Sequence, residues 1–275
     1  MDALTLLRLQ VEWGADEAID AEPVDRLAAR DRAPATTVTR LAPSGPAPIG
    51  APRSVGTAPP VASAGTPAER AFAAAARAAD LDALRAAIAA FDGCALRDTA
   101  SHLVFATGDP GSGLLMIGEP PAAEEDRAGT PFAGREGDLF DRMLASIGLT
   151  RAGMLLAPLI PWRPPGGRPP NAGEITVCLP FLHRVIALAA PERIVIWGSL
   201  AARTLLGAAA GRRRGTASWV DCAVPGVPGS VPALVLPGLT ELLKTPLRRK
   251  DAWAGLRLLR RTLDAAANGP GQAGP

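Results

Sequence analysis

Short apolar runs alternate with stretches of helical periodicity through the middle of the chain. The apolar runs begin at Leu114, Met154, Arg193 and Pro232. Between these runs, apolar side chains recur every three or four positions in residues 136–149, 173–190 and 199–207. Strands that alternate with helices are typical of a parallel sheet covered by helices on both faces. The pattern therefore predicts a three-layer α/β/α domain with a short central parallel sheet.

The same pattern divides the chain into segments. Residues 67–91 predict one long alanine-rich helix, and residues 246–265 predict a final basic helix. Residues 1–14 carry Leu, Val and Trp at helical spacing and predict a short amphipathic helix, whereas residues 33–66 have the composition of a flexible linker. We expect a helical segment over 1–32, a disordered linker over 33–66, a globular domain over 67–265 and a disordered tail over 266–275.

Composition and charge narrow the class of protein only slightly. The chain has 275 residues, of which 48% are hydrophobic, and a net charge of +2. From Arg203 onward there are eleven Lys or Arg against four Asp or Glu, whereas the first forty residues hold eight acids and five bases. A basic C-terminal third is typical of a phosphate-binding face and equally of an ordinary solvated helix.

The cysteine count and the N-terminal sequence bear on the compartment. Three cysteines are too few, and odd in number, for a disulfide framework, which favours a reducing compartment. No apolar run reaches the roughly 18 residues that a membrane helix needs. The N-terminus has no basic leader followed by an apolar stretch, so it does not resemble a signal peptide. We expect a cytoplasmic protein that does not bind a membrane.

The predicted strand ends locate a candidate site before any relative is considered. In open parallel sheets the ligand crevice lies beyond the carboxyl ends of the strands. Here those ends are residues 118–120, 158–162, 198–199 and 237–238. We expect the residues of the site to come from these four places.

Four sequence blocks surround these strand ends. They read "GEPPAAEEDRAGTPFAGREGDLFDRMLASIGL", "PWRPPGGRPPNAGEITVCLPFL", "PERIVIWGSLAARTLLG" and "LPGLTELLKTPLRRKDAWAGL". In this order and spacing the blocks resemble those of the bacterial family 4 uracil-DNA glycosylases, over roughly residues 81–263. The resemblance implies the fold of that superfamily and a relation to base-excision-repair hydrolases, which cleave the N-glycosidic bond of a damaged base in DNA.

A glycosylase extracts a base from the stack, grips its face and edge, and stabilises the departing anion. By the resemblance, Phe132 matches the ring that stacks on the flipped base, and Glu119 matches the acidic strand-end residue. Gly118 and Pro121 would shape the wall of the base pocket near the scissile bond. Phe132 is alternatively a core phenylalanine, and Glu119 is alternatively a capping or salt-bridged carboxylate.

The chain departs from the family at two base-pocket positions. Pro158 stands where the family has the Asn that reads the uracil edge, and Gly238 stands where it has the His that stabilises the leaving oxygen. The only histidines, His102 and His183, lie away from the predicted strand ends, and we expect structural roles for both. Losing one transition-state donor costs about 100- to 1000-fold in rate. We therefore expect weak or absent uracil excision.

The family also binds a four-iron cluster through four cysteines, and this chain keeps two of them. Phe91 and Trp162 occupy two ligand positions, whereas Cys94 and Cys178 keep the other two. Two thiolates are too few for a cluster that is held by four. We expect no cofactor, and a purified protein that is colourless and free of iron.

Basic residues of the same blocks are the candidates for binding DNA. Leu243 and Lys244 match the loop that in the family wedges into DNA where the base leaves, and Arg248 and Lys250 begin the last predicted helix. The residues expected to contact DNA are Arg163, Arg168, Arg212, Arg214, Leu243, Lys244, Arg248 and Lys250. The alternative for all of them is a solvated basic face.

Three functions remain open at this point. The leading hypothesis is a uracil-DNA-glycosylase-like protein that binds DNA and has weak or no uracil excision. The second is an active glycosylase with displaced catalytic groups or another damaged base as substrate. The third is a non-catalytic interaction module, with residues 1–14 docking onto a protein partner. We expect a monomer.

Overall fold

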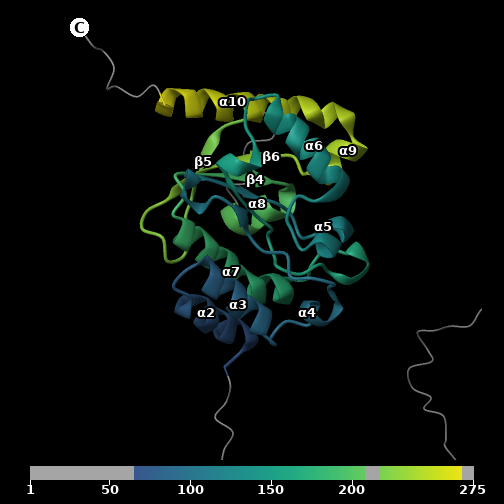
Figure 1. The fold of residues 1–275 in the computed structure, drawn as a ribbon, viewed down its shortest axis with the longest axis vertical. Coiled ribbons are helices and arrows are strands. Elements are labelled where there is room, and N and C mark those ends of the chain that lie inside the picture. Colours follow the sequence, from purple (N-terminus) through teal and green to yellow (C-terminus); the bar gives the residue numbers. More distant parts are fainter. Residues whose placement is uncertain (1–64, 208–216, 268–275) are drawn as a thin grey trace, which may run out of the picture. The chain divides into compact units, whose positions relative to one another are not determined.

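The computed structural model describes residues 65–207 and 217–267. These residues form a domain built on one mixed sheet of six strands (Figure 1). The strands are β1 (Thr107–Gly108), β2 (Leu114–Ile117), β3 (Leu155–Ala157), β4 (Arg193–Trp197), β5 (Trp219–Cys222) and β6 (Val231–Leu236). Their order across the sheet is β1-β3-β2-β4-β6-β5. The four middle strands are parallel, as predicted, and the edge strands β1 and β5 are antiparallel to their neighbours.

Helices and short 3-10 turns connect the strands. The helices are α2 (Pro67–Arg77), α3 (Leu81–Ala90), α4 (Leu96–Thr99), α5 (Ala123–Ala128), α6 (Gly134–Ala145), α7 (Ala172–Ala189), α8 (Ser199–Leu206), α9 (Leu239–Lys244) and α10 (Arg249–Ala267). The 3-10 turns are Pro110–Ser112, Arg151–Gly153, Pro165–Gly167 and Pro246–Arg248. The segment at Leu239–Lys244, expected to be a loop, is therefore the helix α9.

The prediction of one long helix over residues 67–91 is wrong, because the chain breaks between α2 and α3. The guanidinium of Arg184, on α7, donates two hydrogen bonds of 3.1 and 2.6 Å to the carbonyl oxygen of Ala78. Asp80 then caps the N-terminus of α3, its side chain accepting from the backbone N–H of Ala83 at 2.7 Å. The hydrogen bonds from Arg184 and the cap at Asp80 both stabilise a break in the chain, so two helices form instead of one.

Two apolar layers cover the sheet, one on each face, and their residues alternate along every central strand as strand geometry requires. In β2, Leu115 and Ile117 pack with α2, α3, α7 and α8, whereas Leu114 and Met116 pack with α6, α9 and α10. Figure 1 shows α6 and α10 on one side of the sheet and α2, α3 and α7 on the other. The predicted three-layer architecture is confirmed.

Helix α7 corrects the expectation that no run is long and apolar enough to span a membrane. Among the described residues, this one helix meets the criterion by length and composition alone. Its side chains Phe181, Val185 and Ile186 are buried in the core that includes α2 and α3. Apolar helices of a protein core meet the same criterion, so length and composition alone do not assign α7 to a membrane.

Some of the expected features fall on residues outside the described ranges. These are the amphipathic helix over 1–14, the linker over 33–66 up to residue 64, the tail from residue 268, and the arginines Arg212, Arg213 and Arg214. Within the described chain, α2 begins after Thr66, which forms a capping box with Glu69.

Candidate functional site

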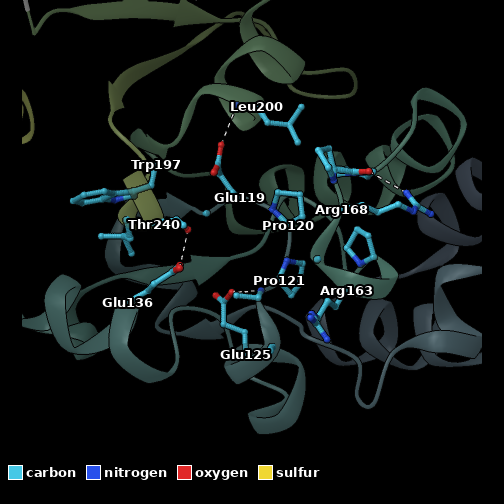
Figure 2. Close-up of a pocket in the computed structure, with 18 of the residues that line it drawn as sticks. Glu119, Pro120, Pro121, Glu125, Glu136, Arg163, Arg168, Trp197, Leu200 and Thr240 are labelled. Atoms are coloured by element: carbon cyan, nitrogen blue, oxygen red, sulfur yellow. Dashed lines mark hydrogen bonds between the residues drawn. The ribbon is translucent and has the colours of Figure 1, made fainter. Parts of the chain in front are cut away.

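A pocket of about 470 Å³ lies at the carboxyl ends of the parallel strands, where the strand ends predict the site (Figure 2). Its wall comes from the turn after β2, the start of α6, the proline-rich loop before α7, the start of α8 and the start of α9. Six of the predicted residues line it: Gly118, Glu119, Pro121, Phe132, Arg163 and Arg168. The fold therefore brings together residues that are distant from one another in the sequence.

Two predicted base-pocket residues lie elsewhere. Gly238 lines a neighbouring cavity of about 300 Å³, which shares Glu119 and Thr240 with the main pocket. Pro158 is buried and lines a cavity of only about 20 Å³ together with Phe181 of α7. The placement of Pro158 in the base pocket is thus corrected: β3 has ended at Ala157, and the proline packs against the α3 and α7 side of the sheet.

Glu119 caps a helix at the edge of the pocket. Its Oε1 accepts a hydrogen bond of 3.1 Å from the backbone N–H of Leu200, in the first turn of α8 (Figure 2). The positive end of the helix dipole favours a carboxylate at this position. Two glycines make room for the side chain: a Cβ on Gly198 would overlap Glu119, and one on Gly238 would lie 3.2 Å from Oε2. The capping alternative for Glu119 therefore describes its contacts in this structure.

The backbone of Phe132 has a left-handed conformation, with φ of 54°, and is bonded on both sides. Its N–H donates to Oε1 of Glu125 at 2.6 Å, and its carbonyl oxygen accepts from the guanidinium of Arg151 at 2.5 Å. Such a conformation is costly for a residue with a side chain and persists only where surrounding contacts impose it. Glu125 and Arg151 together therefore hold the backbone of Phe132 in this conformation.

The ring of Phe132 is both a core side chain and part of the pocket wall. It stacks on Phe140, with ring centroids 4.4 Å apart and an interplanar angle of 21°. The tip of the ring faces Gly118, where an added Cβ would lie 3.2 Å from Cζ. Only 3% of the residue is exposed, so the two alternatives for Phe132 are not exclusive.

Glu125 is a partly buried carboxyl group that the sequence does not single out. Burial raises its pKa from 4.5 to about 7, and the nearby Glu136 adds to this. Hydrogen bonds from the backbone N–H groups of Ala122 and Phe132, and the charge of Arg151, act in the opposite direction. The desolvation is the largest of these effects, so the ionised form of Glu125 is disfavoured in the folded protein.

Folding stability should therefore depend on the protonation of Glu125. Because the folded pKa lies above the unfolded one, this group is expected to lower the free energy of unfolding as pH rises from 4.5 to about 7, by about 3 kcal/mol in all. Glu125→Gln should remove this part of the pH dependence. Urea unfolding of wild type and variant between pH 4.5 and 8 measures it.

Glu174 provides a control of opposite sign for this measurement. The Arg168 guanidinium lowers the pKa of Glu174, so its contribution is present at neutral pH and is lost as the pH falls. Because this loss occurs below pH 4.5, Glu174→Gln should leave the slope between pH 4.5 and 7 as in wild type and should remove a contribution of opposite sign below pH 4.5. A Glu125→Gln variant with the wild-type pH slope between 4.5 and 7 would contradict the assignment.

Charged and polar residues complete the pocket wall. Thr240 of α9 donates a hydrogen bond of 2.7 Å to Glu136 of α6, which links two sides of the pocket (Figure 2). Arg168 forms a two-bond ion pair with Glu174, at 2.9 and 2.6 Å. The Nε of Arg163 is buried and has no hydrogen-bond partner among the residues that the structure describes.

Sequence reasoning did not single out several residues of the wall, and those with polar or aromatic side chains are Glu125, Glu136, Trp197, Arg203 and Thr240. All five lie within or directly beside the quoted blocks, so proximity to a strand end is the signal that could have found them. Helical periodicity does not tell which acid of a polar stretch faces a cavity, because solvent and cavity both accept polar side chains.

The predicted DNA-contacting residues of the last block take different positions. Leu243 is partly buried against the core, and Leu242 is fully buried. Leu247 is the exposed apolar side chain of this segment, with 87% of its surface accessible. Arg248 pairs with Glu241 and Asp251, whereas Lys244, Arg249 and Lys250 are exposed.

The positions that match cluster ligands form an apolar, tightly packed region. The sulfurs of Cys94 and Cys178 lie 3.8 Å apart, and both residues are buried. Phe91 packs edge-on against Phe181 at a centroid distance of 5.3 Å, and Trp162 is 2% exposed. Two thiols beside two aromatic rings do not fit a cluster held by four thiolates. No set of three or more His, Cys, Asp or Glu side chains suited to a metal occurs in the described ranges.

Neither histidine lines the pocket. The Nδ1 of His102 lies 2.9 Å from the carbonyl oxygen of Asp126. His183 lies within α7, where burial lowers its pKa. The side chains that line the pocket, within the described residues, thus include no imidazole and no amide.

Comparison with known proteins finds related sequences over most of the described domain. The sequence profile described as the Uracil DNA glycosylase superfamily matches residues 105–257. A type-4 uracil-DNA glycosylase of Pyrobaculum aerophilum is 35% identical over 127 residues, which is 46% of this chain and 65% of that protein. Type-4 uracil-DNA glycosylases of Archaeoglobus fulgidus (36% identical over 110 residues, 40% of this chain) and Thermotoga maritima (32% over 108, 39%) are similar. The match spans 55% and 56% of these last two proteins.

Proposed function

Because the chain belongs to the uracil-DNA glycosylase superfamily, we propose that it binds DNA at the pocket face and excises uracil weakly or not at all. The observation that carries this proposal is the side-chain content of the pocket. Phe132 and Glu119 lie in the wall, but the imidazole position is Gly238 and the amide position is Pro158. The site keeps a ring beside the cavity and lacks the two groups that read and release uracil in the family.

The chemistry of N-glycosidic cleavage explains why these two losses matter. The departing base takes the electrons of the bond and needs a donor at its developing negative oxygen. Gly238 offers only its backbone, and Glu119, the nearest side chain to it, is a carboxylate that would repel the negative charge. Glu119 moreover already accepts the N–H of Leu200. The pocket therefore favours holding a base over expelling one as an anion.

The surface beside the pocket supports DNA as the partner. Lys244, Arg249 and Lys250 are exposed around the 3-10 turn that carries Leu247. Cations hold phosphates, and an apolar side chain such as Leu can enter a base step. We propose Leu247, in place of Leu243, as the side chain that contacts the bases where DNA opens.

Binding to DNA is expected to depend steeply on salt, because a cationic side chain that neutralises a phosphate releases counterions. The triple variant Lys244→Ala, Arg249→Ala, Lys250→Ala should bind more weakly. On duplex DNA, its slope of log affinity against log salt should be shallower by about 0.9 for each phosphate that the variant no longer neutralises. Fluorescence anisotropy with labelled single- and double-stranded oligonucleotides measures both quantities.

The matched control for this experiment is Arg77→Ala with Arg85→Ala, two exposed arginines of α2 and α3 on the opposite helical layer. These changes should leave the affinity and the salt slope as in wild type. A wild-type protein with no affinity for DNA at low salt would favour the interaction-module hypothesis, and equal losses in both variants would contradict the placement of the DNA surface.

A second candidate function is excision of a base other than uracil. The observation that favours it is the pair of carboxylates in the wall, since Glu119 and Glu136 both line the pocket. Ionised carboxylates only accept hydrogen bonds, so they match base edges that carry amino groups better than the oxygen-rich edge of uracil. Incubation with oligonucleotides that each contain one damaged base, followed by strand cleavage, tests this candidate.

A further inference from the structure

We propose that Cys94 and Cys178 form an oxidisable dithiol that closes to an intramolecular disulfide bond. The two sulfurs are 3.8 Å apart and lie in one buried cluster, although the residues are 84 positions apart in the sequence. Cys94 lies in the loop between α3 and α4, and Cys178 lies within α7. This site does not depend on the proposed function of the pocket.

The geometry requires only a small movement. A disulfide bond has an S–S distance of about 2.05 Å, so the sulfurs must approach by roughly 1.8 Å, which rotation about the Cα–Cβ bonds and a shift of the loop can supply. Cys94 lies in the α3–α4 loop, outside any helix. At 3.8 Å the two sulfurs are in van der Waals contact, so no other side chain lies between them.

The surroundings favour a bond between the sulfurs over a bound metal ion. Phe91 and Trp162, which are 7% and 2% exposed, stand at the other two matching positions and offer no ligand atoms. No third His, Cys, Asp or Glu joins the pair among the described residues. The two thiols are thus each other's only sulfur partners there.

The third cysteine provides an internal control. Cys222 of β5 is also buried, but its sulfur contacts the carbonyl oxygen of Leu205 at 4.0 Å and no other sulfur within the described ranges. Cys94 is 5% exposed, whereas Cys178 and Cys222 are 0% exposed. Cys94 is thus the most exposed of the three, and we expect the oxidant to react there first.

The reaction balances with a low-molecular-weight disulfide as the oxidant. The sulfur of Cys94, having lost its proton, attacks one sulfur of the oxidant, and the other half leaves as a thiolate that takes up that proton. The sulfur of Cys178 then attacks Cys94 and releases the second half, which takes the proton of Cys178. One protein disulfide forms, and the oxidant is reduced to two thiols.

The bond would crosslink the α3–α4 loop to α7, which follows the proline-rich loop of the pocket. A crosslink that closes a long loop stabilises the folded protein chiefly by restricting the unfolded chain, typically by an amount that raises the Tm by about 5 to 15 °C in a domain of this size. The effect should disappear when a reductant is added.

The test is oxidation of the full-length protein with oxidised glutathione, followed by unfolding in an alkylating reagent, digestion and mass spectrometry. We expect a linked peptide pair containing Cys94 and Cys178, and alkylation of Cys222 alone. The Tm should rise relative to the reduced protein, in wild type and in Cys222→Ala but not in Cys94→Ala.

Three outcomes would overturn the proposal. They are alkylation of all three cysteines after oxidation, glutathione retained on Cys94 without a link to Cys178, and a bond that includes Cys222. Because the linked peptide is sought in the wild-type chain, the test holds even if Cys94→Ala fails to fold.

Discussion

Uracil excision by this protein is expected to be at least about a hundredfold slower than by a superfamily member that has both the imidazole and the amide in its pocket. The reason is the loss of transition-state stabilisation at Gly238 and of edge recognition at Pro158. Single-turnover cleavage of uracil-containing single- and double-stranded oligonucleotides, with alkali to break the abasic product, measures the rate. Excision at ordinary enzymatic rates would refute this prediction.

Restoring the missing groups should recover part of the rate, and the structure separates their contributions. A Cβ at residue 238 lies 3.2 Å from Oε2 of Glu119, so the imidazole of Gly238→His would enter beside the pocket after a small shift of that carboxylate. Pro158 lies in the small cavity near Phe181, so Pro158→Asn alone should recover little. We expect the double variant to exceed wild type mainly through residue 238.

The matched control is Gly153→His, because a Cβ at Gly153 meets no atom within 4 Å. Gly153 ends the 3-10 turn before β3, so it lies at the amino end of that strand, whereas the pocket lies at the carboxyl ends. This change should leave the excision rate at the wild-type level. A double variant that folds, shown by an unchanged Tm, and still does not excise uracil would show that the loss extends beyond these two positions.

Gly198→Ala should destabilise the protein by about 2 to 6 kcal/mol, since strain and overpacking each cost about 1 to 3 kcal/mol. Gly198 has φ of 108°, a conformation that strains a residue with a Cβ, and the new methyl group would overlap Glu119. Urea unfolding of Gly198→Ala, with Gly153→Ala as the control at an open position without positive φ, measures the loss.

A second substitution divides this loss into its two causes. Glu119→Ala removes the overlap and leaves the backbone strain, so Gly198→Ala should cost less in that background. The difference between the two costs gives the contribution of the Glu119 overlap. Equal costs in both backgrounds would show that Glu119 does not occupy the space beside Gly198, and a stable Gly198→Ala variant would contradict the strain as well.

The central sheet and the place of the pocket could be predicted from the sequence. The runs at Leu114 and Arg193 are apolar on both faces of the strand, and such runs between amphipathic helices have few other arrangements than buried parallel strands. The pocket followed from topology, since the ends of parallel strands meet at one edge. The replaced residues Gly238 and Trp162 could be identified through the resemblance, because matching the family's blocks shows which residue stands at each position.

The short edge strand and the break between two helices could not be predicted from the sequence, because both depend on tertiary contacts. Strand β1 has two residues, and its pairing with β3 rather than its own pattern makes it a strand. The break before α3 depends on Arg184, which is distant in sequence and reaches Ala78 only after α7 has packed. Local pattern contains no information on such a partner.

The sequence by itself determined the layers and the parallel centre, because these depend on periodicity, and its resemblance to the family indicated which groups are missing. Only the tertiary structure decided which side chains face the pocket. Glu125 bonds the peptide of Phe132, Glu119 caps α8, and Pro158 turns away toward α7. The physical reason is that a polar or small residue at a strand end is compatible with solvent, a cap or a cavity. The choice among these three is made by residues far away in the chain.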